Sequence, residues 1–246
     1  DGWILGYPAG FDRAWNHLPY MVDGKEQVYL GASLTAALFF LRLYYLTGEE
    51  NYLIHGKDIG EKLCLYGWDK DRGYWLTSVE KEPPYRPTDS QSVQWWIQIY
   101  GALLQLHLYH VTGEEHYLEN FRKSESFYER YFRDHEYGGV FSGVTPDGSF
   151  FGKGEKAGPW HTSYHEIEHG FLNYLYLNLY VNKKPVVLHF QLDGPATHFV
   201  SPVDDPNIKI MGVTINGGRW TNFDPLAHSI TVPPGKNLHV QVTLGP

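Results

Sequence analysis

An internal repeat of 65 residues constrains the fold of this chain more than any other feature. TGEENYL at 47–53 recurs as TGEEHYL at 112–118, and in the same register Gly73 aligns with Gly138. Repeats of this length are supersecondary units that bury their apolar faces by stacking on one another. We therefore expect a repeated architecture.

Each copy is predicted to hold an apolar inner helix, and the first two copies also an amphipathic outer helix. The TGEE segments supply a Thr N-cap and acidic residues for the first turn of each outer helix. A Gly-marked loop follows each outer helix, and the second loop is predicted to be a hairpin turning at 146–148. The inner helices are expected at 28–46, 92–111 and 160–181, and the outer helices at 50–66 and 114–133.

The helical copies indicate a mainly α fold of (α/α) toroid hairpins over residues 1–184, with 1–27 irregular. A ring of six such hairpins needs about 390 residues, and about 180 are present, so the chain forms about half a barrel. An open half-ring exposes an apolar wall. We expect a second chain, another copy or an N-terminal half to complete it.

Residues 185–246 follow a different pattern, because apolar and polar residues alternate there between Gly and Pro turns. Alternation with period two is typical of half-buried strands. We expect a small antiparallel, β-sandwich-like accessory domain. Trp220 and Phe223 could form a sugar platform in it, but packing of the sheet is the favoured role.

Composition narrows the classes of partner. The net charge is −8 and no basic stripe is visible, so nucleic acid is not expected. The apolar run at 28–46 could span a membrane by length, but Arg42 within it favours a buried helix. Cys64 is the single cysteine, which excludes an intrachain disulfide and leaves the cellular location open. The aromatic content of 16% suits either sugar stacking or a toroid core.

The repeat also indicates a candidate catalytic residue. It aligns Trp95 with Trp160 and Tyr100 with His165. A histidine that replaces tyrosine in one copy marks that copy as specialised, and imidazole suits proton transfer near neutral pH. His165 is therefore the first candidate for chemistry.

HEIEH at 165–169 matches the HExxH zinc pattern, in which two histidines share a helix face with a Glu base. A tetrahedral site needs a third protein ligand, and none follows at the expected spacing. We expect neither metal nor cofactor. Glu166 could instead close a capping box with Ser163, or the helix could begin at Pro159 and align three histidines, His161, His165 and His169.

The segment 138–169 also resembles a known family. GGVFSGVTPDG, followed by Lys156, Trp160, Tyr164 and His165, resembles the last hairpins of the N-acylglucosamine 2-epimerase superfamily, which includes cellobiose 2-epimerases and aldose–ketose isomerases. Trp95-Trp96-x-Gln98 resembles the family's tryptophan-bearing helix one hairpin earlier. The resemblance covers about residues 28–181 and implies an (α/α)6 barrel. It also implies two histidines that move a proton next to a sugar carbonyl.

By this resemblance His165 is the general acid/base and Trp160 stacks on the sugar. Glu168 or Glu166 would orient the imidazole, with His169 as a further support. The family's HxxE motif aligns with Val28 and Gly31, and Tyr100 stands where the family has a glutamate, so one base is missing. Glu166, Glu168, His169 or Tyr100 could replace it, or the reaction differs. The candidate sugar-binding residues are Trp95, Trp96, Trp160, His161 and Tyr164.

We therefore expect a sugar epimerase- or isomerase-like enzyme with a mono- or oligosaccharide substrate. Three alternatives stay open. They are an α/α-toroid lyase or hydrolase acting on an oligosaccharide, a non-catalytic carbohydrate-binding or scaffold protein, and an HExxH zinc hydrolase.

Overall fold

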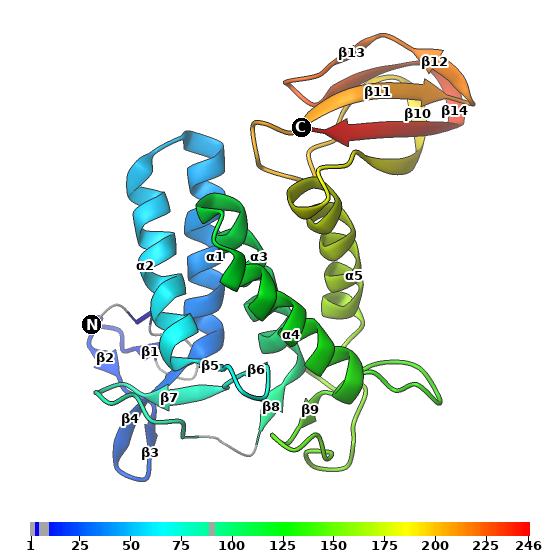
Figure 1. The fold of residues 1–246 in the computed structure, drawn as a ribbon. Coiled ribbons are helices and arrows are strands. Elements are labelled where there is room, and N and C mark those ends of the chain that lie inside the picture. Colours follow the sequence, from blue (N-terminus) through cyan, green and yellow to red (C-terminus); the bar gives the residue numbers. More distant parts are fainter. Residues whose placement is uncertain (1–2, 5–9, 89–91) are drawn as a thin grey trace. The chain divides into compact units, whose positions relative to one another are not determined.

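The computed structural model describes residues 3–4, 10–88 and 92–246 (Figure 1). Two compact units divide the chain. The first holds residues 1–44 and 49–169, and the second holds 45–48 and 170–246. This division falls inside a helix after His169, whereas the change from helix to sheet follows at 182–185.

Helix pairs in the first unit reproduce the repeat. α3 (Trp95–Thr112) begins and ends 65 residues after α1 (Leu30–Thr47), and α4 (Glu115–Tyr131) is shifted equally from α2 (Glu50–Tyr66). The flanking strands repeat too, because β4 (Lys25–Tyr29) pairs with β7 (Ser78–Glu80) as β8 (Val93–Gln94) pairs with β9 (Gly143–Val144). The predicted inner and outer helices of the first two copies are confirmed.

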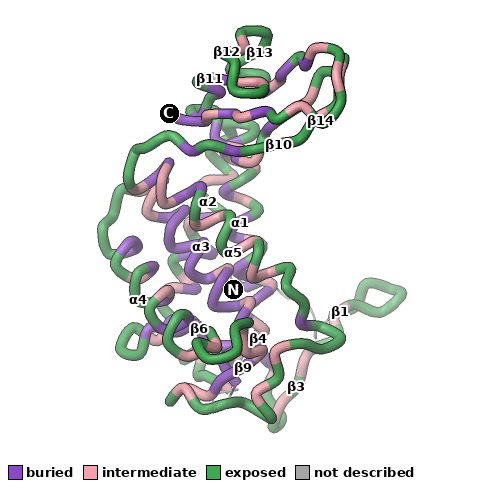
Figure 2. Tube along the Cα trace, turned by 90° about the vertical axis from the view of Figure 1, so that its right-hand side faces the viewer, coloured by how far each residue is buried: buried purple, intermediate pink, exposed green. Residues whose placement is uncertain are grey.

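Close helix packing explains the apolar inner helices. A Cβ at Gly56 of α2 would lie 2.9 Å from the side chain of Leu41, and one at Gly60 would lie 3.0 Å from that of Leu108. α2 therefore lies tightly against both α1 and α3, and most of α3 is buried whereas α4 exposes its outer side (Figure 2). α1 is long and apolar enough to cross a membrane, but 44% of it is buried within the protein.

The TGEE segments end helices as well as starting them. Thr47 and Thr112 are the last residues of the inner helices, and the following Gly48 and Gly113 adopt positive φ angles of 72° and 73°. A left-handed glycine after a helix is a frequent C-terminal stop. The predicted Thr N-caps are wrong, because the N-cap positions are Glu49 and Glu114, neither with a side-chain capping bond.

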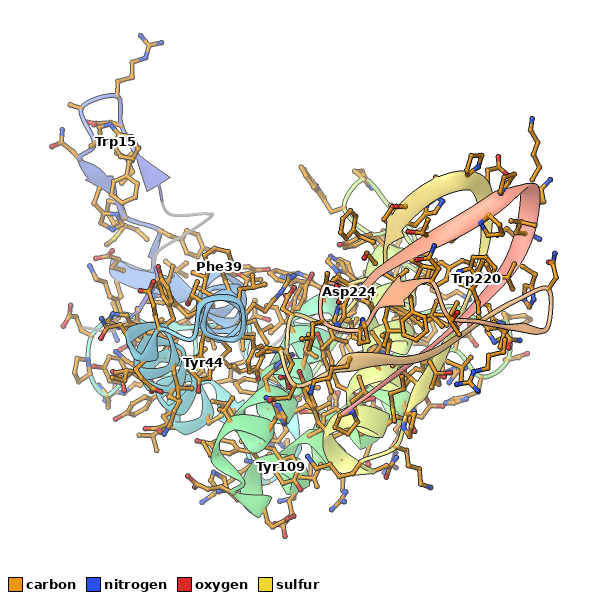
Figure 3. All side chains as sticks on the ribbon, turned by 90° about the horizontal axis from the view of Figure 1, so that it is seen from above. Trp15, Phe39, Tyr44, Tyr109, Trp220 and Asp224 are labelled. Atoms are coloured by element: carbon orange, nitrogen blue, oxygen red, sulfur yellow. The ribbon has the colours of Figure 1, made fainter. Side chains whose placement is uncertain are left out.

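The N-terminal segment is more regular than predicted. In its described part, β1 (Gly10–Phe11) pairs with β2 (His17–Leu18), and β3 (Met21–Val22) pairs with β4. Trp15 lies near the tip of the first hairpin, 82% exposed (Figure 3). A further hairpin, β5 (Trp68–Asp69) with β6 (Tyr74–Trp75), lies between α2 and α3.

The third inner helix begins later than the repeat predicts. α5 (Tyr164–Tyr176) starts four residues past the expected position 160, and a π-helical turn, η1 (Leu177–Val181), extends it. Reciprocal backbone hydrogen bonds between Gly158 and His161 fold the preceding residues into a tight loop. Trp160 therefore lies ahead of the helix.

The second unit is built on one antiparallel sheet in the order β10-β14-β11-β12, with β13 paired to β14. Alternate residues of β14, among them Val240, Val242 and Leu244, are fully buried, as the alternating sequence predicts. Trp220 donates its indole N–H to the Thr231 carbonyl at 3.0 Å, which favours a packing role. The strands are β10 (Val186–Phe199), β11 (Lys209–Ile215), β12 (Gly218–Trp220), β13 (Phe223–Asp224) and β14 (Ser229–Gly245).

Helix hairpins and an antiparallel β part are thus both present. The expectation of a mainly α chain is too strong, since 37% of the residues are helical and 29% lie in strands. Nearly half of the strand residues belong to two long strands, β10 and β14.

Candidate functional site

The first turns of α3 and α5 bring the candidate residues together. Trp95, Trp96 and Tyr100 come from α3, and His165 and Glu168 come from α5. All five lie in the first unit. Helices of neighbouring repeats that begin at the same level expose their first turns side by side, which is how a repeat builds one site from distant residues.

His165 lies among aromatic rings. Its imidazole stacks on Trp96 with the ring centroids 6.2 Å apart and the planes 20° from parallel, and it meets the Tyr100 ring edge-on at 5.5 Å. A quarter of the side chain is exposed. The ring is therefore held in position while it can still be reached from solvent.

Glu168 is the polar centre of the cluster. Its Oε2 accepts the Tyr100 hydroxyl at 3.0 Å and lies 3.4 Å from Nδ1 of His165, and its Oε1 lies 3.5 Å from the Tyr164 hydroxyl. A carboxylate at Nδ1 favours the tautomer that carries its proton there. The lone pair of Nε2 is then available as a base.

Tyr100 is a hydrogen-bond donor in this site. Burial raises the pKa of its phenol above the ordinary value, and the negative charge and hydrogen bond of Glu168 raise it further. The hydroxyl is therefore neutral throughout the physiological range. It can donate a proton or a hydrogen bond, but it cannot act as a base.

Gln94, together with Tyr29, holds the N–H edge of the Trp96 indole in place. Its indole N–H donates to Oε1 of Gln94 at 3.0 Å, and the hydroxyl of Tyr29 donates to the same oxygen. Below the ring lies Gly31, where a Cβ would come within 2.0 Å of the indole. Any side chain at position 31 would therefore collide with the Trp96 ring.

The side chains of Trp95 and His161 are buried and pack against each other. Trp95 is 7% exposed and His161 4%, and their ring centroids are 4.2 Å apart. Nε2 of His161 lies 2.6 Å from Oε1 of Glu166. Both side chains are therefore buried in this structure, and direct contact of Trp95 or His161 with a sugar stays a prediction. Glu166 pairs with His161, and no capping bond to Ser163 is seen.

His169 is directed away from His165. Its Nε2 lies 2.9 Å from Glu125 on α4, and its ring meets Tyr128 edge-on at 4.8 Å. His169 thus links α5 to α4 in this structure, and its support of His165 stays a prediction. The two histidines of HEIEH have different partners, and no group of three possible metal ligands converges within the described residues.

Trp160 and Tyr164 lie at the exposed rim. Trp160 is 90% exposed and Tyr164 63%. The Tyr164 ring meets the His165 ring edge-on at 5.0 Å. Tyr164 therefore borders the imidazole directly, whereas the position of Trp160 ahead of the helix leaves its indole faces open.

Sequence reasoning missed the support from Tyr29 and Gln94. The repeat offered a signal for both, because these two residues are themselves 65 positions apart and directly precede equivalent inner helices.

Stacked helix hairpins that gather a histidine and aromatic rings at their starts are consistent with an α/α-toroid fold. The sequence profile of the family described as N-acylglucosamine 2-epimerase (GlcNAc 2-epimerase) matches residues 11–168, more than half of the chain. The chain belongs to this family.

Solved structures agree on the fold. A sugar epimerase from a ruminal bacterium matches with a TM-score of 0.55 at 20% identity, covering 66% of this chain and 40% of its own. Cellobiose 2-epimerase from Spirochaeta thermophila matches with a TM-score of 0.54 at 22% sequence identity. The match covers 66% of this chain and 39% of the epimerase. A D-mannose isomerase matches with a TM-score of 0.55 at 19% sequence identity. The match covers 63% of this chain and 38% of the isomerase. The chain thus spans about 40% of these relatives' length. No curated protein matches its sequence significantly.

Proposed function

We propose that this chain carries an acid/base histidine of a sugar epimerase or isomerase, and that the histidine is His165. The proposal depends above all on one observation. The imidazole contacts the rings of both Trp96 and Tyr100 and has Glu168 at Nδ1, which leaves Nε2 to accept a proton.

The chemistry is proton transfer at the carbon next to a sugar carbonyl. His165 removes the proton through Nε2, and Glu168 stabilises the imidazolium that forms. The neutral Tyr100 hydroxyl donates its one proton to Glu168 in the free protein, and it can redirect that hydrogen bond to a sugar oxygen that gains negative charge. Trp96 offers its apolar face to the sugar ring, with Trp160 and Tyr164 at the rim.

The described residues supply one such histidine. Isomerisation of an aldose to a ketose can use a single base that removes and returns the proton on one face of the sugar. Epimerisation with delivery from the opposite face needs a second group. His169 and Glu166 are engaged elsewhere, so in that case we expect the second group to come from the completing half of the toroid.

Exchange of the sugar's α-hydrogen with deuterated water tests this proposal. Cellobiose, mannose and N-acetylglucosamine are incubated with the protein and followed by NMR. We expect exchange with one of them, and a loss of at least a hundredfold in His165→Ala. His116→Ala, an exposed position on α4, serves as the matched control.

Three results are informative. Full exchange by His165→Ala would show that another residue is the base. Sugar binding by the wild type without exchange would favour the non-catalytic alternative. An unsaturated product absorbing in the ultraviolet would favour a lyase. Far-ultraviolet circular dichroism of each variant verifies that the fold is intact.

A further inference from the structure

A shallow groove lies on the first unit between the outer helix α4 and the turn that joins β5 to β6. Its lining includes Arg72 from the turn and Arg122, Lys123, Ser126, Arg130 and Tyr131 from α4. The turn lies directly on the helix, because a Cβ at Gly73 would come within 3.1 Å of the Lys123 carbonyl oxygen. The groove is therefore built from two packed elements.

Positive charge concentrates in this groove although the chain is acidic. Arg122, Ser126 and Arg130 are spaced four residues apart, which places them along one face of α4 over about 12 Å. Lys123 and Arg72 add two cations beside this face. Asp71 is the acidic residue in the lining, and Asp69 and Asp147 lie close to Arg72.

Most of these cations have no acidic partner. Within the described residues, no carboxylate forms an ion pair with Arg122, Lys123 or Arg130, and all three are exposed. Arg72 lies 3.9 Å from Asp69 and is 61% exposed. By contrast Arg133, just beyond the end of α4, is paired with Glu129 at 3.0 Å. The unpaired cations are available to an external anion.

An aromatic ring is fixed at one end of the groove. Tyr131 packs against Gly148, where a Cβ would come within 2.1 Å of the ring, and its centroid lies 4.8 Å from that of Phe127. The Arg130 guanidinium lies 5.0 Å from the Tyr131 ring centroid. The ring is held by packing, so little conformational entropy is lost when a ligand binds against it.

We propose that this groove binds an acidic oligosaccharide, with carboxylate or sulfate groups on the arginines and a sugar ring near Tyr131 and Ser126. Guanidinium groups bind such oxyanions through charge-assisted, often paired hydrogen bonds. Charges spread over about 12 Å suit a chain that carries one anionic group on each sugar.

Nucleic acid fits the same groove less well. Duplex DNA carries one negative charge for about every 1.7 Å of its axis, far denser than four cations can neutralise. A single fixed ring also differs from the series of aromatic platforms on which bases stack.

Isothermal titration calorimetry of the full chain tests the proposal. A hexamer of galacturonic acid is the carboxylate probe and a sulfated maltohexaose the sulfate probe, with unmodified maltohexaose as the neutral control. A short DNA duplex represents nucleic acid. We expect at least one acidic hexamer to bind, and binding to weaken as salt is raised because exposed charges are screened.

Two double variants remove equal charge at different places. Arg122→Gln/Arg130→Gln should weaken binding about tenfold. Arg133→Gln/Arg219→Gln should retain it within about twofold. Equal losses in both variants, tighter binding of the duplex, or no binding of either acidic hexamer would overturn the proposal. The groove variant leaves the His165 cluster intact, so sugar exchange there should be unchanged and the two proposals can fail independently.

Discussion

At the scale of single residues, Glu168 organises the candidate site. Its carboxylate accepts hydrogen bonds from two tyrosine hydroxyls and lies beside Nδ1 of His165. One carboxylate therefore orients the base, holds its tautomer and fixes the neutral phenol beside it. The sequence named all four residues, but it did not show which of the two nearby glutamates has this role.

Replacement of Tyr100 by Phe separates donation by the phenol from its packing. The ring contact with His165 survives, while Glu168 loses its closest donor. We expect kcat for the exchange reaction to fall at least tenfold, because a donor to developing negative charge is removed. Stability should fall by only about 1 kcal/mol. Tyr109→Phe, on the same helix, is the matched control, and unchanged kcat in Tyr100→Phe would limit Tyr100 to packing.

The raised pKa of Tyr100 also predicts a dependence of stability on pH. The folded protein holds this proton more tightly than the unfolded chain, whose ordinary value is 10.0. The resulting stabilisation is complete below that pH and is lost as pH rises through the folded value. In urea titrations at alkaline pH, the free energy of unfolding should therefore decline less steeply for Tyr100→Phe than for the wild type. Parallel declines would contradict this assignment.

At the scale of elements, the repeat predicted four helices nearly to the residue, because the same apolar pattern occurs twice. It did not predict the start of α5. His161 packs beneath Trp95 and pairs with Glu166, and these tertiary contacts hold 158–163 as a loop. The basic groove was equally invisible in the sequence, since Arg72 meets α4 only after β5 and β6 have folded against it.

Gly31 of α1 links element packing to the site. Because a Cβ there would lie 2.0 Å from the Trp96 indole, Gly31→Ala should displace the ring. We expect a destabilisation of about 1–3 kcal/mol, measured by urea unfolding, and an altered tryptophan fluorescence. Gly170→Ala in α5 is the contrast, because no atom lies within 4 Å of its added Cβ. It should stabilise the helix by up to about 1 kcal/mol. Equal effects of the two substitutions would exclude the clash as the cause.

At the scale of the whole molecule, the helix pairs expose apolar side chains. Phe39 on α1 is 59% exposed (Figure 3), and Ile54 and Leu65 on α2 are 51% and 69% exposed. The chain also spans about 40% of the length of toroids with the same fold. Both observations support our proposal that another copy or another half completes the ring.

Size-exclusion chromatography with light scattering tests completion of the ring by a second copy. We expect a mass of about twice 28.3 kDa for the chain, since burying Phe39 and its neighbours removes apolar surface from water. Phe39→Asp should then shift the mass toward the monomer, while Lys57→Asp on α2 should not. A monomer that binds an apolar dye would instead indicate a wall that awaits a separate segment. A monomer without dye binding would contradict the half-ring altogether, because no surface would remain for a partner to cover.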